Sequence, residues 1–345
     1  MKSWRWLFIV GTLPLLLVGC NFIQTPRQRK ISPQEIKKSV VLISYENQGG
    51  HGSGFFVEGE KGVCTVLTAR HVTLTEMRLK LKTKDEKTWD AVSIRRFPNH
   101  DLALVEFKPE GKNCSYQSLP LGDSDRVAGG DIVRISGYFN SGGRLVNHVV
   151  NGRVTAIDEL PEGYGIAYDA TTGGGMSGGP VVNEMREVIA IHGRSDTEIL
   201  ELTELKGESV PSVLQAAGSQ ASVFKWGIPT QIYLVNRDEA PKVAAGRALT
   251  AEDYLILGHW FVILGRYDEA LGAYKKALDI QPNLHEAWYS RGIALQDLGK
   301  YEEAIASYDK ALDTQPILTI QFQLPGNFLA AFRGSPIPPQ RRHHF

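Results

Sequence analysis

Cysteine is scarce in this chain of 345 residues, which has only Cys20, Cys64 and Cys114. No group of cysteines and histidines has the spacing of metal ligands, so we expect no metal and no organic cofactor. The chain also lacks an excess of either charge, because 38 lysines and arginines balance 38 aspartates and glutamates. This balance gives no reason to expect nucleic acid as a partner.

An uncharged, mostly apolar run from Trp6 to Gly19 follows a positively charged start. The run is too short to span a bilayer comfortably and has the length of a signal-peptide core. It ends in Leu17-Val18-Gly19-Cys20, which resembles the bacterial lipobox, in which the cysteine receives a lipid. Residues 1–20 therefore predict export. The protein is either a membrane-anchored lipoprotein, facing the periplasm or cell exterior of a bacterium, or a protein with an ordinary secretory signal.

Export affects how the two remaining cysteines are interpreted. An oxidising compartment permits a disulfide between Cys64 and Cys114. The alternative is a pair of buried free thiols, which pack as small apolar side chains. Sequence spacing cannot fix the distance between two Cα atoms, so both possibilities remain open.

Short runs of β-branched and other apolar residues begin after a polar tether at residues 21–38. Turn residues separate the runs, which is typical of an all-β barrel or sandwich. Residues 194–222 are charged and serine-rich and predict a long surface loop, and a terminal helix is expected from Thr230. We expect strands at residues 40–43, 54–57, 63–67, 103–107, 132–135, 181–182, 188–191 and 224–229.

The pattern changes near residue 249, where residues 251–284 align with residues 285–318. The period, about 34 residues, and the aligned glycines, alanines and prolines resemble the tetratricopeptide repeat (TPR). Gly258 and Gly292 would let the two helices of each pair approach closely. The resemblance implies an all-α domain at residues 249–318 whose groove binds a protein partner, and the alternative is a plain pair of helical hairpins. Residues 319–345 are rich in proline and are expected to form a disordered tail.

Three short motifs carry the chemistry, and they contain His71, Asp101 and Ser177 in that order. They read LTARHV, HDLALV and GGGMSGGP. A serine hydroxyl needs an adjacent base to act as a nucleophile, and His71 would take its proton. Asp101 would hold the imidazole in the required tautomer, and the N–H groups of Gly175 and Ser177 would form an oxyanion hole. Five other histidines are assigned to packing or the surface: His51, His100, which precedes Asp101 in its motif, His148, His259 and His285.

Together the motifs resemble the trypsin-like peptidase superfamily, over a domain expected at residues 39–240. The resemblance implies a double-barrel, chymotrypsin-like fold and a serine endopeptidase that cuts polypeptide substrates through an acyl-enzyme. The compact spacing is similar to bacterial Deg/HtrA-type and glutamyl endopeptidases. No segment resembles the PDZ domain of the Deg type, and the repeats occupy its place.

The same resemblance points to a pocket for the substrate residue before the scissile bond, called P1. Thr172 and His192 are similar to the pair that binds a P1 carboxylate in glutamyl endopeptidases. Alternatively, His192 packs within its strand and the pocket accepts small apolar residues. No aspartate stands six residues before Ser177 to attract a basic P1 residue. The pocket residues are Thr171, Thr172, Ile191, His192 and Gly193.

Two classes of function fit these observations. The first is an active endopeptidase whose repeats recruit substrates or partners. The second is a catalytically silent adaptor in which the repeats bind proteins. The complete set of His71, Asp101 and Ser177 favours the enzyme. An esterase is disfavoured because the three residues occur in the order His, Asp, Ser and not in the Ser, Asp, His order of that class.

Overall fold

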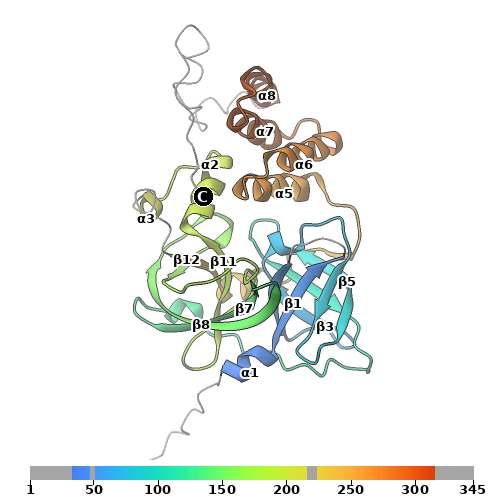
Figure 1. Ribbon diagram of the computed structural model, residues 1–345, viewed down its shortest axis with the longest axis vertical. Coiled ribbons are helices and arrows are strands. Elements are labelled where there is room, and N and C mark those ends of the chain that lie inside the picture. The colour runs from blue at the N-terminus through green and yellow to red at the C-terminus, as the bar shows by residue number, and fades with distance from the viewer. Residues whose placement is uncertain (1–32, 47–50, 216–223, 315–345) are drawn as a thin grey trace, which may run out of the picture. The chain divides into compact units, whose positions relative to one another are not determined.

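The computed structural model describes residues 33–46, 51–215 and 224–314, in which two β-barrels are followed by four helices (Figure 1). The expected signal segment, Cys20, most of the tether and the expected tail lie outside the described residues. No helix within the described ranges is both long and apolar enough to cross a membrane.

The first barrel has six antiparallel strands in the order β5-β4-β1-β2-β3-β6, and it closes by pairing of β5 with β6. Strand β13 (Lys242–Ala244), from the segment before the helices, also pairs with β5. A disulfide joins Cys64 and Cys114, with their Cα atoms 5.0 Å apart. The six strands are β1 (Val40–Tyr45), β2 (His51–Val57), β3 (Cys64–Thr68), β4 (Leu79–Lys82), β5 (Thr88–Arg96) and β6 (Ala103–Phe107).

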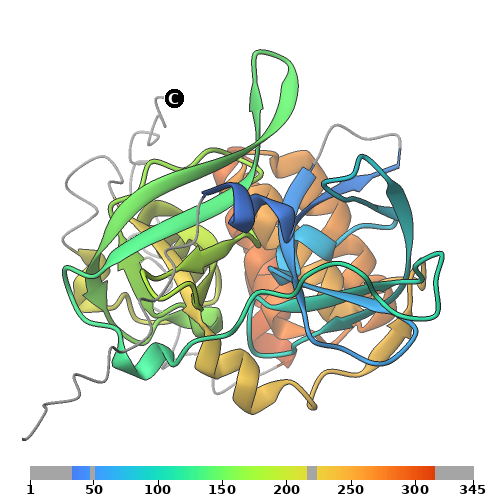
Figure 2. The same cartoon turned by 90° about the horizontal axis from the view of Figure 1, so that it is seen from below.

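The second barrel closes in the order β10-β11-β12-β9-β8-β7. Its long β7–β8 hairpin projects beyond the barrel (Figure 2). The two closed barrels confirm the double-barrel fold expected from the sequence. The strands are β7 (Ile132–Ser141), β8 (Arg144–Ile157), β9 (Ile166–Tyr168), β10 (Pro180–Val182), β11 (Val188–Ser195) and β12 (Lys225–Pro229).

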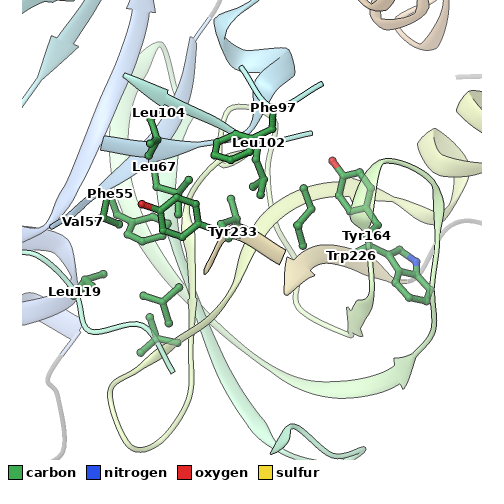
Figure 3. Packing of buried hydrophobic residues seen from close by; sticks show 14 of the residues in the cluster. Phe55, Val57, Leu67, Phe97, Leu102, Leu104, Leu119, Tyr164, Trp226 and Tyr233 are labelled. Carbon is green, nitrogen blue, oxygen red and sulfur yellow. The ribbon is translucent and has the colours of Figure 1, made fainter. Parts of the chain in front are cut away.

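A hydrophobic cluster joins the two barrels (Figure 3). Phe55 and Leu67 enter it from the first barrel, and Trp226 enters it from the second. Helix α4 (Thr230–Asn236), which begins where the sequence predicts, adds Tyr233. Helix α1 (Pro33–Lys38) lies within the segment expected as a tether, but its Ile36 is fully buried in this cluster. The apolar side chain therefore draws the end of the tether into the fold.

The expected loop at residues 194–222 is wrong, because helices α2 (Asp196–Leu205) and α3 (Ser212–Gln215) form there. Ser195 and Glu198 make a capping box at the start of α2, which satisfies backbone N–H groups that a helix start leaves free. Ile199 and Leu202 then bury the inner face of the helix. The many charged residues of this segment led to the prediction of a loop, although its apolar residues lie on one face of a helix.

The C-terminal helices form two antiparallel pairs, as the repeat period predicts. Gly258 packs against the ring of Tyr274, and a Cβ at this position would lie 2.3 Å from that ring. Gly292 and Tyr308 repeat the same arrangement. The helices are α5 (Ala251–Ile263), α6 (Tyr267–Ile280), α7 (His285–Asp297) and α8 (Tyr301–Thr314).

Candidate active site

The ends of strands β3 and β6 bring His71 and Asp101 together. The strands are antiparallel, with Thr68 at the end of β3 opposite Ala103 at the start of β6. His71 lies just after β3, in a short 3₁₀ turn (Arg70–Thr73), and Asp101 lies just before β6. The N–H of Arg70 donates to the carbonyl of Asp101 over 3.0 Å and joins the two segments. The strand register therefore places both residues at one edge of the barrel.

Asp101 holds His71 through both of its carboxylate oxygens. Oδ1 accepts the backbone N–H of His71 at 2.8 Å, and Oδ2 lies 2.6 Å from Nδ1 of its ring. Asp101 is fully buried. Because an ionised carboxylate can only accept hydrogen bonds, Nδ1 carries the ring proton and Nε2 is left as the basic nitrogen.

Two further side chains complete the surroundings of Asp101. The hydroxyl of Tyr164 donates to Oδ2 at 2.5 Å, and Nε of Arg194 lies 3.5 Å from the same oxygen. Gly193 provides the space for this phenol, because a Cβ there would lie 2.2 Å from the Tyr164 oxygen. Arg194 is 1% exposed, so its charge acts with little screening by water.

These neighbours decide the charge of Asp101. Burial alone would raise its pKa, but the charge of His71 and the hydrogen bond from its ring act in the opposite direction. The Arg194 guanidinium and the Tyr164 hydroxyl add to this effect, so the pKa of Asp101 stays well below its usual value. The carboxylate is therefore ionised across the physiological range.

Ser177 lies in a glycine-rich turn just before β10, and Ser53 of β2 holds this turn from the other barrel. The N–H of Ser53 donates to the carbonyl of Ser177 at 2.8 Å, and its hydroxyl donates to the carbonyl of Gly175 at 2.8 Å. The N–H of Tyr138 donates to the Ser53 oxygen at 2.8 Å. Gly175 has a φ of 97°, a backbone conformation that glycine adopts without strain.

The backbone N–H groups of this turn differ in whether they have a backbone acceptor. Within the described ranges, the N–H groups of Gly175 and Ser177 donate to no backbone carbonyl, whereas the N–H of Met176 between them donates to Gly173. Two such donors converging on one position can stabilise a negatively charged oxygen.

A cavity of about 1170 Å³ contains His71, Ser177 and Gly175 in its lining. The Ser177 hydroxyl donates to the carbonyl of Gly193 at 3.1 Å. Among the described residues, the acceptor of this hydroxyl is therefore Gly193 and not the imidazole of His71. Catalytic hydrogen bonds are often long or poorly aligned without substrate and tighten only when it binds.

The five expected pocket residues do not share one environment. Thr172, His192 and Gly193 line the cavity, whereas Ile191 is fully buried between the barrels and Thr171 is exposed. The hydroxyl of Tyr168 lies 2.6 Å from Nδ1 of His192. Burial lowers the pKa of His192 to about 3, so its ring is neutral at physiological pH.

The sequence interpretation missed most residues that line the cavity, among them His51 and Trp260. His51, assigned there to packing or the surface, lines the cavity with Nε2 against Gly175, where an added Cβ would lie 1.9 Å from it. Trp260 of helix α5 also lines the cavity, and its ring lies 4.7 Å from the ring of His71. No local motif marks either residue, because both reach the site through long-range packing.

Comparison with known families agrees with this geometry. Residues 52–191 match the trypsin-like peptidase domain, and this segment contains His71, Asp101 and Ser177. Residues 258–299 match one TPR family and residues 285–316 match the tetratricopeptide repeat. The helical pairs are therefore TPR repeats rather than plain hairpins.

Characterised relatives are similar to the peptidase part of the chain. Serine protease HTRA1 of Xenopus laevis is 33% identical over 176 residues, which are 47% of this chain and 36% of that protein. Periplasmic serine endoprotease DegP of Escherichia coli (strain K12) is 31% identical over 144 residues, 41% of this chain and 29% of that protein. The chain thus spans about a third of the length of these relatives.

Proposed function

We propose that this chain, which carries a trypsin-like peptidase domain followed by TPR repeats, is a serine endopeptidase with Ser177 as its nucleophile. The observation that carries the proposal is the double contact of Asp101 with His71, next to a cavity that also contains Ser177. A carboxylate on Nδ1 makes Nε2 of His71 the base that a serine nucleophile requires.

In the proposed reaction, Ser177 Oγ bonds to the carbonyl carbon of the substrate while its proton passes to Nε2 of His71. The peptide C–N bond then breaks, and His71 gives the proton to the departing amine. Water repeats the sequence on the acyl-enzyme and releases the carboxylic acid. The N–H groups of Gly175 and Ser177 stabilise the oxyanion, and Asp101 stabilises the imidazolium throughout.

For P1 we keep two alternatives, an acidic residue and a small apolar residue, and a neutral His192 supports the first only as a hydrogen-bond donor. Burial raises the pKa of Tyr168 well above its usual value, so its phenol keeps its proton and donates it to Nδ1 of His192. The proton of His192 itself is then on Nε2, which acts with the hydroxyl of Thr172 as a donor to a substrate carboxylate. A pocket for small apolar residues is the competing outcome.

We also propose that the protein is exported and that its repeats bind polypeptides. The signal-like residues 1–20 and the similarity to a periplasmic relative support an exported bacterial protein. Lipidation of Cys20 would hold the enzyme at the membrane. The TPR repeats recruit polypeptide substrates or a protein partner, which raises the local substrate concentration.

Cleavage of an unbiased peptide library tests the proposal, with Ser177→Ala as the matched control. We expect cuts by the parent chain that disappear in the variant. A glutamate before the cut supports the Thr172–His192 pocket, whereas a small apolar residue there contradicts the acidic preference and keeps the enzyme. If no cut depends on Ser177, the endopeptidase proposal fails and a silent adaptor explains the chain better.

A further inference from the structure

The first helix of the repeats, α5, contacts the proposed catalytic residues directly. The indole of Trp260 lies over the ring of His71, with centroids 4.7 Å apart and planes inclined by 31°. The guanidinium of Arg194, which also contacts Asp101, lies 5.1 Å from the same indole. A repeat residue therefore packs against both the imidazole and the buried charges that support it.

The cavity over Ser177 continues between the peptidase domain and the repeats. Helix α5 and Leu264, which follows its last residue, supply one wall, and the side chains that line it are all apolar or aromatic. We call the residues Leu257, Trp260, Phe261 and Leu264 the α5 wall. A substrate held at Ser177 would lie in a space that this wall shares with His71.

Most charged side chains that line the cavity form ion pairs. The α5 wall is therefore an apolar surface with few unpaired charges beside it. Paired charges offer little attraction to a charged substrate, because each is already neutralised by its neighbour. The ion pairs are Glu76 with Lys276 and Arg266 with Glu269, whereas Glu198 accepts the N–H of Ser195 and keeps its charge, and Lys225 also lines the cavity.

Contacts on two sides fix the α5 wall against the peptidase domain. At the start of α5, the hydroxyl of Tyr254 donates to Glu76 over 2.5 Å, and Asp253 lies 3.5 Å from Arg96. On the other side, the hydroxyl of Ser290 in α7 donates to the carbonyl of Leu205 in α2 at 3.2 Å. These contacts favour a permanent part of the cleft over a lid that must open.

We infer that the α5 wall is a specificity subsite, which selects an apolar side chain in a substrate residue close to the scissile bond. An extended peptide advances about 3.3 Å per residue. A side chain touching Trp260 therefore belongs to a residue near the bond that Ser177 attacks. The inference rests on the proposed endopeptidase activity and assigns part of its selectivity to the repeats.

Trp260→Ala tests the inference in the full chain through the cleavage profile of a peptide library. We expect the parent to prefer apolar residues at one position near the cut, and the variant to lose this preference. For a peptide with leucine at that position, kcat/KM should fall about 10- to 100-fold, and for its alanine analogue by less than about 3-fold. Trp260→Phe should retain part of the preference.

Charge variants keep the test decisive if Trp260→Ala fails to fold. Leu257 is half-buried, so a long charged side chain can be accommodated there. Leu257→Lys should shift the selected substrate residue towards aspartate or glutamate, and Leu257→Glu should shift it towards lysine or arginine. Trp288→Ala removes a tryptophan from the second repeat that does not line the cavity, and it should leave the profile unchanged.

Labelling of Ser177 by a small fluorophosphonate separates failure of the inference from failure of the proposed function. The probe is too small to need the α5 wall, so Trp288→Ala should label at the rate of the parent, and labelling of the Leu257 variants shows whether Ser177 remains reactive in them. An active parent whose profile is unchanged by these variants would overturn the subsite. A rise in kcat/KM for every peptide would also overturn it, by identifying α5 as an inhibitory lid. A parent that neither labels nor cleaves would overturn the endopeptidase and the subsite with it.

Discussion

The hydroxyl of Tyr164 donates to Asp101 over 2.5 Å, at the same carboxylate oxygen that accepts Nδ1–H of His71. This phenol lies in the second barrel, whereas the carboxylate and the imidazole lie in the first. The contact therefore couples the orientation of the proposed base to the packing of both barrels. It also replaces water as a hydrogen-bond donor to a carboxylate that is fully buried.

Tyr164→Phe should lower kcat about 3- to 30-fold, because a hydrogen bond to a buried charge is lost without a change in shape. Steady-state kinetics on one peptide substrate measures the effect. Tyr168→Phe is the matched control, since it removes a hydroxyl from His192 rather than from Asp101. It should alter KM or the P1 preference more than kcat. Equal kcat values for the parent and Tyr164→Phe would show that Tyr164 has no positioning role.

Buried His259 should make the protein sensitive to acid. Burial, and then the charges of Lys206, Arg194 and Arg70, lower its pKa to about 3 from an ordinary 6.5. Between these pH values the unfolded chain binds a proton that the folded chain does not, so stability is lost as the pH falls. The slope is about 1.4 kcal/mol per pH unit for one such histidine.

His259→Gln should therefore reduce the pH dependence of unfolding by about 1.4 kcal/mol per pH unit between pH 4 and 6. Glutamine keeps a group that can bond to Ser290, the partner of His259 at 3.0 Å. Urea unfolding at several pH values provides the measurement. His192, with its low pKa, contributes a similar slope that remains in this variant. An unchanged slope would contradict a neutral, buried His259.

Glu201 in helix α2 should destabilise the protein at alkaline pH. Burial raises its pKa to about 7, and the neighbouring Glu198, Glu204 and Asp297 add to the effect. The folded state then holds a proton that the unfolded state releases near pH 4.5, so stability falls as the pH rises to 7. Because Glu201 is only half-buried, water screens part of this cost.

Glu201→Gln should raise the unfolding free energy by about 1–2 kcal/mol at pH 8. At pH 4 the unfolding free energies of the variant and the parent should differ little. Urea titrations at the two pH values test this difference. An equal effect at both values would attribute the change to packing rather than to charge.

Loss of the disulfide between Cys64 and Cys114 should lower the unfolding free energy by about 2–4 kcal/mol. The bond belongs to the first barrel, and neither cysteine lines the cavity. Cys114→Ser should therefore keep its peptidase activity at 25 °C while its urea midpoint falls. A large loss of kcat in a folded variant would indicate that the bond also positions the site.

The sequence predicts those helices and strands whose residue patterns are evident within a short segment. Runs of β-branched residues mark β1, β3 and β6, and the period of the repeats marks α5 to α8. Strands β5 and β8 are missed because polar residues interrupt them, and pairing with their neighbours stabilises them instead. Helix α2 had a readable signal in the capping box of Ser195 and Glu198, but its charged composition obscured it.

The residues of the candidate site also fall into a group that the sequence predicts and a group that it does not. His71, Asp101 and Ser177 each stand in a recognisable motif, so their positions can be predicted. Tyr164 and Trp260 have no such motif, and only the packing of separate segments brings them to the site. Contacts between distant segments depend on tertiary structure, which local patterns do not specify.

Intact-mass spectrometry after treatment with a fluorophosphonate shows whether Ser177 is the nucleophile. We expect one covalent adduct per chain, located on Ser177 by peptide mapping and absent from Ser177→Ala. It also predicts slow labelling in His71→Ala, because the hydroxyl then lacks its base. Absence of an adduct from the folded parent, or equal labelling of Ser177→Ala, would contradict Ser177 as the nucleophile.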